Sequence, residues 1–137
     1  MTTTAVPPCH VLVVDDEPLL VRFMTRALEE AGFVVHAFDS GTKALAALLS
    51  EEEFDVVVSD IRMPGVDGHR IAAAARAQAN RPAVLLVTGF QEPELLLEMP
   101  YTARMNKPFD AGELVATVRR IVAARPCDAG SPARRIS

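Results

Sequence analysis

Short apolar runs alternate with amphipathic segments along most of the chain. The runs have the length of buried strands and end in polar or charged residues; they are 10–14, 33–37, 54–60, 83–87 and 101–106. Apolar side chains recur at helical spacing between them, at about 16–31, 40–49, 68–79 and 110–124, with about two further turns at 93–98 between prolines. Glu51-Glu52-Glu53 is expected to form the charged, solvated end of the second helix. This alternation predicts an α/β domain with a parallel sheet and helices on both faces.

The apolar stripes also predict which helical side chains face the core. In the first helix they are Leu20, Phe23, Met24, Ala27 and Leu28. In the second they are Ala44, Leu45, Leu48 and Leu49, and in the last they are Leu114, Val115, Val118, Ile121 and Val122. Gly32 is typical of a helix C-terminal stop, and Asp16 or a neighbour can cap the start of the first helix.

Length and composition fit one domain, since the chain has 137 residues and half of them are apolar. The net charge of −4 gives no sign of the basic patch that nucleic-acid binding needs. No run approaches the ~20 apolar residues that span a bilayer, and the N-terminus does not resemble a secretory signal. Two cysteines without metal-site spacing favour a reduced, cytoplasmic protein. We expect flexible tails at 1–8 and 125–137 around a domain at 9–124.

Acidic residues and one lysine mark the ends of three strand-like runs. Asp15 and Asp16 follow the first run, Asp60 closes the third, and Lys107 follows the fifth. Ligands bind at the carboxyl ends of the strands in such sheets, so these side chains are expected to converge. Carboxylates brought together repel one another unless a divalent cation or a lysine neutralises them. The pattern therefore favours magnesium and phosphoryl chemistry.

Each of these residues also has a plainer interpretation. The Asp15–Asp16 pair suits a helix N-cap, Asp60 before Met63-Pro64-Gly65 suits a surface turn, and most lysines are exposed. Thr88 can be a buried strand threonine bonded to backbone. The second acidic cluster at Asp60 favours a site over a cap alone. The three histidines, His10, His36 and His69, do not cluster by spacing and receive no catalytic role.

Four motifs together resemble the receiver domain of bacterial two-component response regulators. They are Val13-Val14-Asp15-Asp16-Glu17-Pro18, Ser59-Asp60-Ile61-Arg62-Met63-Pro64-Gly65-Val66-Asp67-Gly68, Leu86-Val87-Thr88-Gly89 and Asn106-Lys107-Pro108-Phe109. The resemblance spans roughly 9–124 and is that of a single-domain response regulator. It implies a flavodoxin-like, doubly wound sheet of five parallel strands in the order 2-1-3-4-5, with a short or irregular helix at 93–98.

The resemblance also implies a chemistry for each matching residue. Asp60 would accept a phosphoryl group from a sensor histidine kinase or a histidine phosphotransfer protein. Asp16, Asp60 and the backbone carbonyl of Arg62 would hold Mg²⁺ directly, with Asp15 acting mainly through a bound water. Lys107 would pair with Asp60 and then with the phosphoryl group. Thr88 would swing its hydroxyl toward the new phosphate oxygen as the switch. In this family the lysine–proline peptide, here Lys107–Pro108, is typically cis.

The sequence departs from the family pattern on the output side. Arg104 occupies the position of the usual switch aromatic, and Tyr101 lies three residues earlier. The expected function is still a phosphorylation switch, not an enzyme, that regulates a protein partner through the surface of 93–98, 101–106 and 110–124. We expect a monomer or weak dimer with no direct nucleic-acid or membrane contact. A scaffold that signals without phosphate and a magnesium-dependent phosphohydrolase are the alternatives, although Arg62 occupies the position where such a hydrolase usually has its second acidic residue.

Overall fold

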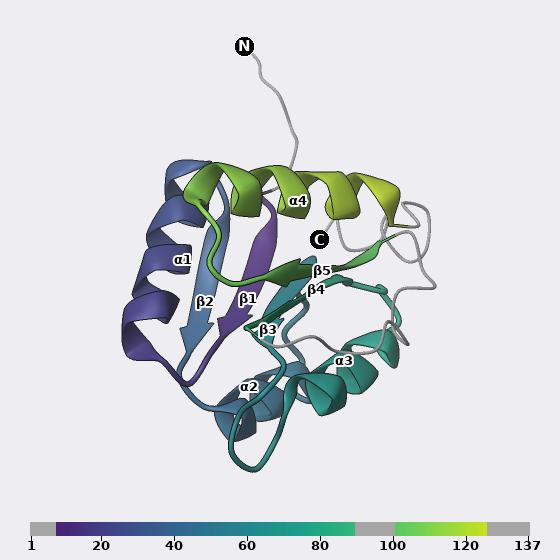
Figure 1. The fold of residues 1–137 in the computed structure, drawn as a ribbon. Helices are drawn as coiled ribbons and strands as arrows, with labels where there is room; N and C mark the ends of the chain where they lie inside the picture. Colours follow the sequence, from purple (N-terminus) through teal and green to yellow (C-terminus); the bar gives the residue numbers. More distant parts are fainter. Residues whose placement is uncertain (1–7, 90–100, 126–137) are drawn as a thin grey trace.

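Five parallel strands form one sheet in the order β2-β1-β3-β4-β5 (Figure 1). The computed structural model describes residues 8–89 and 101–125. Within them the strands are β1 His10–Val14, β2 Val34–Phe38, β3 Val56–Asp60, β4 Ala83–Thr88 and β5 Thr102–Asn106. The flavodoxin-like strand order expected from the sequence is confirmed. The central strands β1, β3 and β4 are almost wholly buried, which explains their unbroken apolar sequences.

Helices cover both faces of the sheet, as predicted (Figure 1). They are α1 Pro18–Glu30, α2 Gly41–Leu48, α3 Gly68–Arg76 and α4 Ala111–Ala124. One apolar cluster joins α1 and α4 to one face through Met24, Leu28 and Leu114. A second cluster joins α2 and α3 to the opposite face through Leu48 and Ile71. The sheet therefore has an apolar core on each face. Its carboxyl edge and its amino edge, where the strands end and begin, carry polar side chains.

The helix boundaries follow local rules at most ends. Pro18 starts α1, where its missing N–H costs nothing, and Gly32 ends it with a φ of 101°. The N-cap residue of α1 is Glu17, a neighbour of Asp16, and its side chain makes no capping bond. Ser40 and Asp110 cap α2 and α4 through their side chains.

Two inward predictions need correction. Leu49 is 65% exposed, because α2 ends at Leu48 and Leu49 is its C-cap residue. Phe23 is 39% exposed, because it lies at the margin of the α1 stripe with its ring 6.2 Å from that of Phe109. The helix expected at 68–79 ends at Arg76. The helix end expected at Glu51-Glu52-Glu53 is also wrong, since α2 ends at Leu48 and residues 51–53 are not helical.

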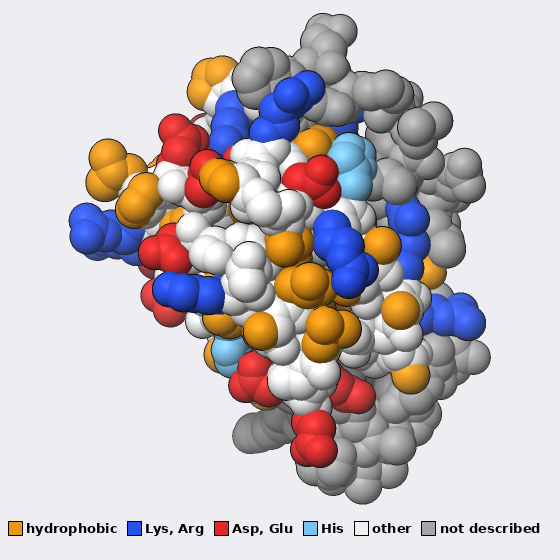
Figure 2. Space-filling view, turned by 90° about the horizontal axis from the view of Figure 1, so that it is seen from below, with side chains coloured by type: hydrophobic (Ala, Val, Ile, Leu, Met, Phe, Trp, Pro, Cys, Tyr) orange, Lys and Arg blue, Asp and Glu red, His pale blue; other side chains and the backbone are white. Residues whose placement is uncertain are grey.

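The face seen in Figure 2 scatters acidic and basic side chains among apolar ones over its described residues. Across 8–89 and 101–125, no helix has both the length and the hydrophobicity needed to cross a membrane. The short helix expected at 93–98 lies outside the described residues.

Candidate metal centre at the carboxyl edge of the sheet

Three carboxylates meet where the first and third strands end. Asp15 and Asp16 directly follow β1, and Asp60 is the last residue of β3, the neighbouring strand. One oxygen from each of the three lies within 4.8 Å of the others. Asp15 and Asp60 are buried, whereas Asp16 is exposed. Asp60, which is far from Asp15 and Asp16 in the sequence, thus joins them in a single acidic pocket that is open to solvent on the Asp16 side.

Lys107 supplies the positive charge of this pocket. Its Nζ lies 3.1 Å from Asp15 Oδ2 and 3.5 Å from Asp60 Oδ1. It also lies 3.3 Å from Glu17 Oε1. The Lys107–Pro108 peptide is cis, as the resemblance implied. One lysine thus faces more than one carboxylate, so the pocket keeps an excess of negative charge.

The electrostatics of the pocket oppose full ionisation of its acids. Burial, and then the Asp15 carboxylate, raise the pKa of Asp60 to about 6, although Lys107 partly offsets both effects. Burial is also the main reason that the pKa of Asp15 is raised. Burial by itself lowers the pKa of Lys107, but the charge and hydrogen bond of Asp15, the charge of Asp60 and the hydrogen bond to Glu17 together outweigh it, and the pKa is raised overall. The lysine therefore stays charged, while the ionised forms of Asp15 and Asp60 are disfavoured.

This donor set fits a hard divalent cation. Asp15 Oδ2 is buried and lies 3.1 Å from the Lys107 ammonium. Its partner oxygen, Oδ1, accepts from the Glu17 N–H at 2.9 Å. Oxygen-only ligands with room for water are what Mg²⁺ requires. A cation here would offset both the burial and the Asp15 charge that raise the pKa of Asp60.

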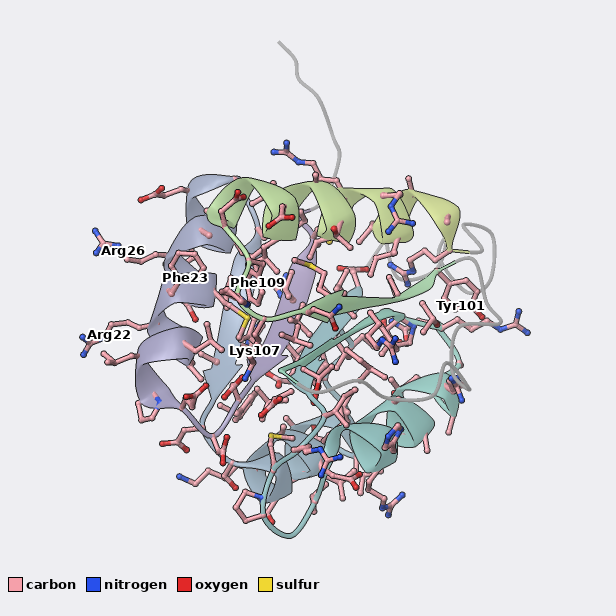
Figure 3. The ribbon with its side chains drawn as sticks, in the orientation of Figure 1. Arg22, Phe23, Arg26, Tyr101, Lys107 and Phe109 are labelled. Atoms are coloured by element: carbon pink, nitrogen blue, oxygen red, sulfur yellow. The ribbon has the colours of Figure 1, made fainter. Side chains whose placement is uncertain are left out.

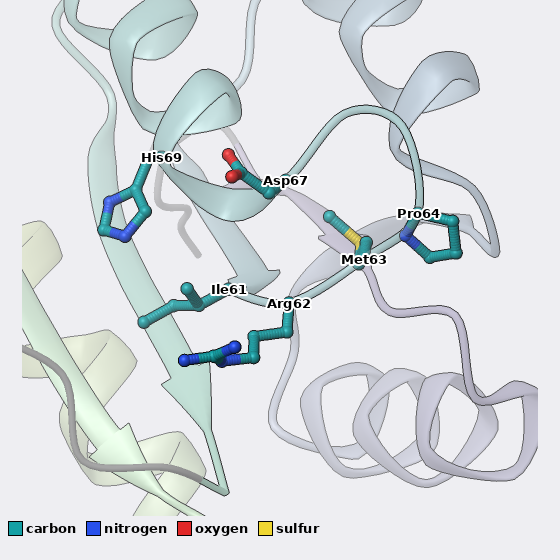
Figure 4. A pocket seen from close by; sticks show the side chains of 6 residues that line it. All are labelled: Ile61, Arg62, Met63, Pro64, Asp67 and His69. Atoms are coloured by element: carbon teal, nitrogen blue, oxygen red, sulfur yellow. The ribbon is translucent and has the colours of Figure 1, made fainter.

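Glycines hold the loop after β3 close to the pocket. Gly68 N–H donates to the Ile61 carbonyl at 2.8 Å, and a Cβ at Gly68 would lie 2.5 Å from the Asp60 carbonyl oxygen. Gly65 adopts a φ of 77°, which favours glycine. Arg62 leaves this loop beside a pocket, and its side chain extends in the same direction as that of His69 (Figure 4). The backbone at 61–68 is therefore fixed against the end of β3.

Thr88 is buried at the end of β4, next to the acidic strand end. Asp60 pairs with Val87 in the β3–β4 register, and the Lys107 N–H donates to the Thr88 carbonyl at 2.8 Å. Tyr101 is buried in the core at the start of β5, and Figure 3 places it at the far end of the strand from Lys107. Tyr101 therefore does not take the place of the missing switch aromatic at the site.

An apolar groove borders Lys107 on the α1 side. It is lined by Leu19, Leu20, Phe23, Pro108 and Phe109, with Glu17 and Lys107 at one end. Figure 3 shows Phe23 and Phe109 beside Lys107, with Arg22 and Arg26 extending outward from α1. Leu19 is 76% exposed, so the groove presents apolar surface next to the acidic pocket.

The opposite edge of the sheet holds two contacts that sequence reasoning did not find. Asp55, just before β3, pairs with Arg125 at 2.8 Å, and both side chains are almost fully buried. His10 Nδ1 lies 3.0 Å from His36 Nε2, although the two residues are far apart in sequence. A β1–β2 register would have been needed to foresee the histidine pair. No local pattern marks Arg125, which fell within the expected tail.

A parallel sheet with acidic side chains and a lysine at its carboxyl edge defines a class of metal-assisted phosphoacceptor domains. The model of the response regulator receiver domain matches residues 11–119. The chain therefore belongs to the receiver-domain family of two-component response regulators.

Known relatives and structures agree with this assignment. The regulatory protein AtoC of Escherichia coli is 35% identical over 114 residues, which cover 81% of this chain and 24% of AtoC. The C4-dicarboxylate transport regulator DctD of Rhizobium meliloti is 37% identical over 113 residues, covering 80% of this chain and 24% of DctD. The chain thus spans about a quarter of the length of these relatives.

Two solved structures match over nearly their whole length. A response regulator receiver protein from Sinorhizobium medicae has a TM-score of 0.79 and 31% identity, covering 87% of this chain and 98% of the other. The chemotaxis response regulator CheY4 of Vibrio cholerae has a TM-score of 0.73 and 30% identity, covering 84% and 99%.

Proposed function

We propose that this protein is a phosphorylation-dependent switch that accepts a phosphoryl group on Asp60 and then regulates a protein partner. The donor would be a sensor histidine kinase or a histidine phosphotransfer protein. The observation that carries the proposal is the approach of Asp15, Asp16 and Asp60 to within 4.8 Å beside Lys107. Membership of the receiver family supports the same reaction. Such chemistry would place the protein in the cytoplasm with its donor.

In the proposed step a carboxylate oxygen of Asp60 attacks the phosphorus of a phosphohistidine. A P–O bond forms, the P–N bond breaks, and its electron pair returns to the donor's imidazole ring. Lys107, already 3.5 Å from Asp60 Oδ1, would follow the charge onto the phosphoryl oxygens. The buried Thr88 would donate its hydroxyl to one of those oxygens. The neighbouring groove of Leu19 and Phe23 offers the donor protein an apolar contact next to Lys107.

Asp16, Asp60 and the Arg62 carbonyl would hold Mg²⁺, with Asp15 acting through a bound water. When bound, the ion offsets negative charge on the transferring phosphoryl group. The approach of three carboxylate oxygens to within 4.8 Å and the raised pKa of Asp60 support a cation at this place. The protein itself contributes the fixed strand ends that keep these oxygens together without rearrangement.

The output surface is proposed to include 93–98, β5 and α4. Arg104 and the buried Tyr101 make the usual threonine–aromatic coupling an unsuitable description of the switch. We propose that the chain phosphorylates and dephosphorylates itself and turns over no separate substrate. A receiver-like scaffold that works without phosphate is the second candidate, and the absence of a switch aromatic at Arg104 favours it.

Intact-mass measurement with a small phosphodonor and Mg²⁺ tests the proposal. Wild type is expected to gain the mass of one phosphoryl group, and Asp60→Asn is expected to gain none. Asp67→Asn is the matched control, because Asp67 caps α3 close to the pocket and Asn also caps helices. No gain in wild type, under conditions that label another receiver, would support the scaffold. Continuous release of phosphate over many turnovers would support a phosphohydrolase.

A further inference from the structure

Two histidines meet at the amino-terminal edge of the sheet, away from the acidic pocket. His10 begins β1, and His36 lies in the middle of β2, the edge strand next to it. Leu12 pairs with His36 in the β1–β2 register, so His10 and His36 lie on the same face, one step apart on the diagonal. His10 Nδ1 lies 3.0 Å from His36 Nε2. The two ring nitrogens are therefore within hydrogen-bond distance of each other.

Contacts from the residues just before β3 position the backbone of one histidine and the ring of the other. The His36 ring packs edge-on against Phe54, with centroids 5.2 Å apart and planes at 80°. The His10 backbone N–H donates to Asp55 Oδ2 at 2.8 Å, which fixes the start of β1. Both histidines are only partly buried, so water and small ions can reach them.

The chemistry of the donors decides which ion this pair would select. Imidazole nitrogens bind zinc, copper and nickel, whereas Mg²⁺ prefers oxygen. A borderline divalent metal is thus the class of ion that these nitrogen donors would select.

We propose that His10 and His36 form a two-histidine chelate for a divalent transition metal ion such as zinc. Two nitrogens that each lie about 2.0–2.1 Å from one zinc ion are roughly 3.0–3.4 Å apart at ordinary angles. The observed separation of the two nitrogens, 3.0 Å, lies at the lower end of this range. Binding needs the two rings to turn so that their lone pairs face the ion, with water completing the shell.

The chelate is independent of the phosphoacceptor pocket. His10 begins β1 and Val14 ends it, so about four strand residues, or roughly 13 Å, separate His10 from the acidic edge. An ion bound to both histidines would tie the edge strand β2 to β1. This inference goes beyond the proposed function and does not depend on Asp60.

Calorimetric titration of zinc into chelator-treated full chain, with excess Mg²⁺ present to fill the acidic pocket, tests the chelate. We expect one zinc ion per chain, with affinity reduced at least about tenfold in His10→Gln and in His36→Gln. Two matched controls, His69→Gln and Asp16→Asn, are expected to bind zinc as wild type does. The same zinc additions should raise the unfolding temperature of wild type, because the ion binds the folded state.

An NMR measurement on wild type, with His69→Gln used for assignment, also tests the chelate if the His10 or His36 variant fails to fold. Histidine side-chain NMR signals are expected to shift for two of the three histidines on zinc addition, and the His69→Gln spectrum identifies the third. Absence of zinc binding in excess Mg²⁺ would overturn the chelate. So would wild-type affinity in His36→Gln, or a zinc-induced shift confined to His69.

Discussion

Both edges of the sheet bury aspartates next to a cation, yet they do so in opposite ways. At the amino edge, Asp55 and Arg125 form an ion pair at 2.8 Å. Asp55 also accepts from the His10 N–H, and the Arg125 guanidinium donates to the Asn80 and Arg81 carbonyls. At the carboxyl edge, Lys107 faces three carboxylates, those of Asp15, Asp60 and Glu17.

The contrast separates a structural ion pair from a functional one. A buried charge with a matched partner and filled hydrogen bonds fixes the positions of the elements it joins. A buried cluster with excess charge raises the pKa of its own acids and leaves a place for another cation. The amino-edge pair ties the end of α4 to the start of β3, and the carboxyl-edge cluster keeps the pocket ready for an ion.

Arg125→Ala should give the largest loss of stability. Removing the guanidinium leaves the buried Asp55 carboxylate without its counter-charge, which costs about 3–5 kcal/mol. Urea unfolding, with and without Mg²⁺, measures the loss, and we expect it to be the same in both conditions. Arg119→Ala, in α4 itself, is the control, because Arg119 is exposed and its side chain donates to a backbone carbonyl, that of Ala31. Equal losses in the two variants would mean that the pair is not structural.

Lys107→Ala should give a smaller loss that Mg²⁺ repairs. Without its ammonium the pocket carries more uncompensated negative charge, so we expect about 1–3 kcal/mol of destabilisation in metal-free protein. Mg²⁺ should then stabilise this variant more than wild type, since it replaces the missing charge. Thermal unfolding across a Mg²⁺ series measures this. Lys43→Ala, which removes only an exposed pair with Asp39, should behave as wild type. A deficit that Mg²⁺ leaves unchanged would assign Lys107 to the same structural kind as Arg125.

The sequence anticipated the carboxyl edge better than the amino edge for a physical reason. Asp15, Asp60 and Lys107 each follow an apolar run, so strand ends predict their meeting once a parallel sheet is assumed. Asp55 and Arg125 are joined only by the docking of α4, and no local spacing signals that contact. The His10–His36 pair likewise depends on which strands are neighbours. Leu49 was placed inward because periodicity does not show where a helix ends.

The smallest expected effect is a pH dependence confined to the carboxyl edge. The folded-state pKa of Asp60 is about 6, above its ordinary value of 3.8. Between these values the folded state binds more protons than the unfolded state, so stability falls as pH rises from about 4 to 6 and then levels off. Asp15 acts in the same direction. We expect this contribution to be about 1–2 kcal/mol, because water and ions reach the pocket through its exposed Asp16 side.

Urea midpoints of wild type and Asp60→Asn, measured from pH 4 to 7 without metal, isolate this contribution as a difference between two curves. The variant should become relatively more stable than wild type as pH rises, because its amide stays neutral. Saturating Mg²⁺ should flatten or reverse the difference, since the ion favours the ionised carboxylate in the folded state. Parallel curves in metal-free protein would show that Asp60 is no more strained than an ordinary surface acid. The two edges would then differ in hydrogen bonding alone and not in stored charge.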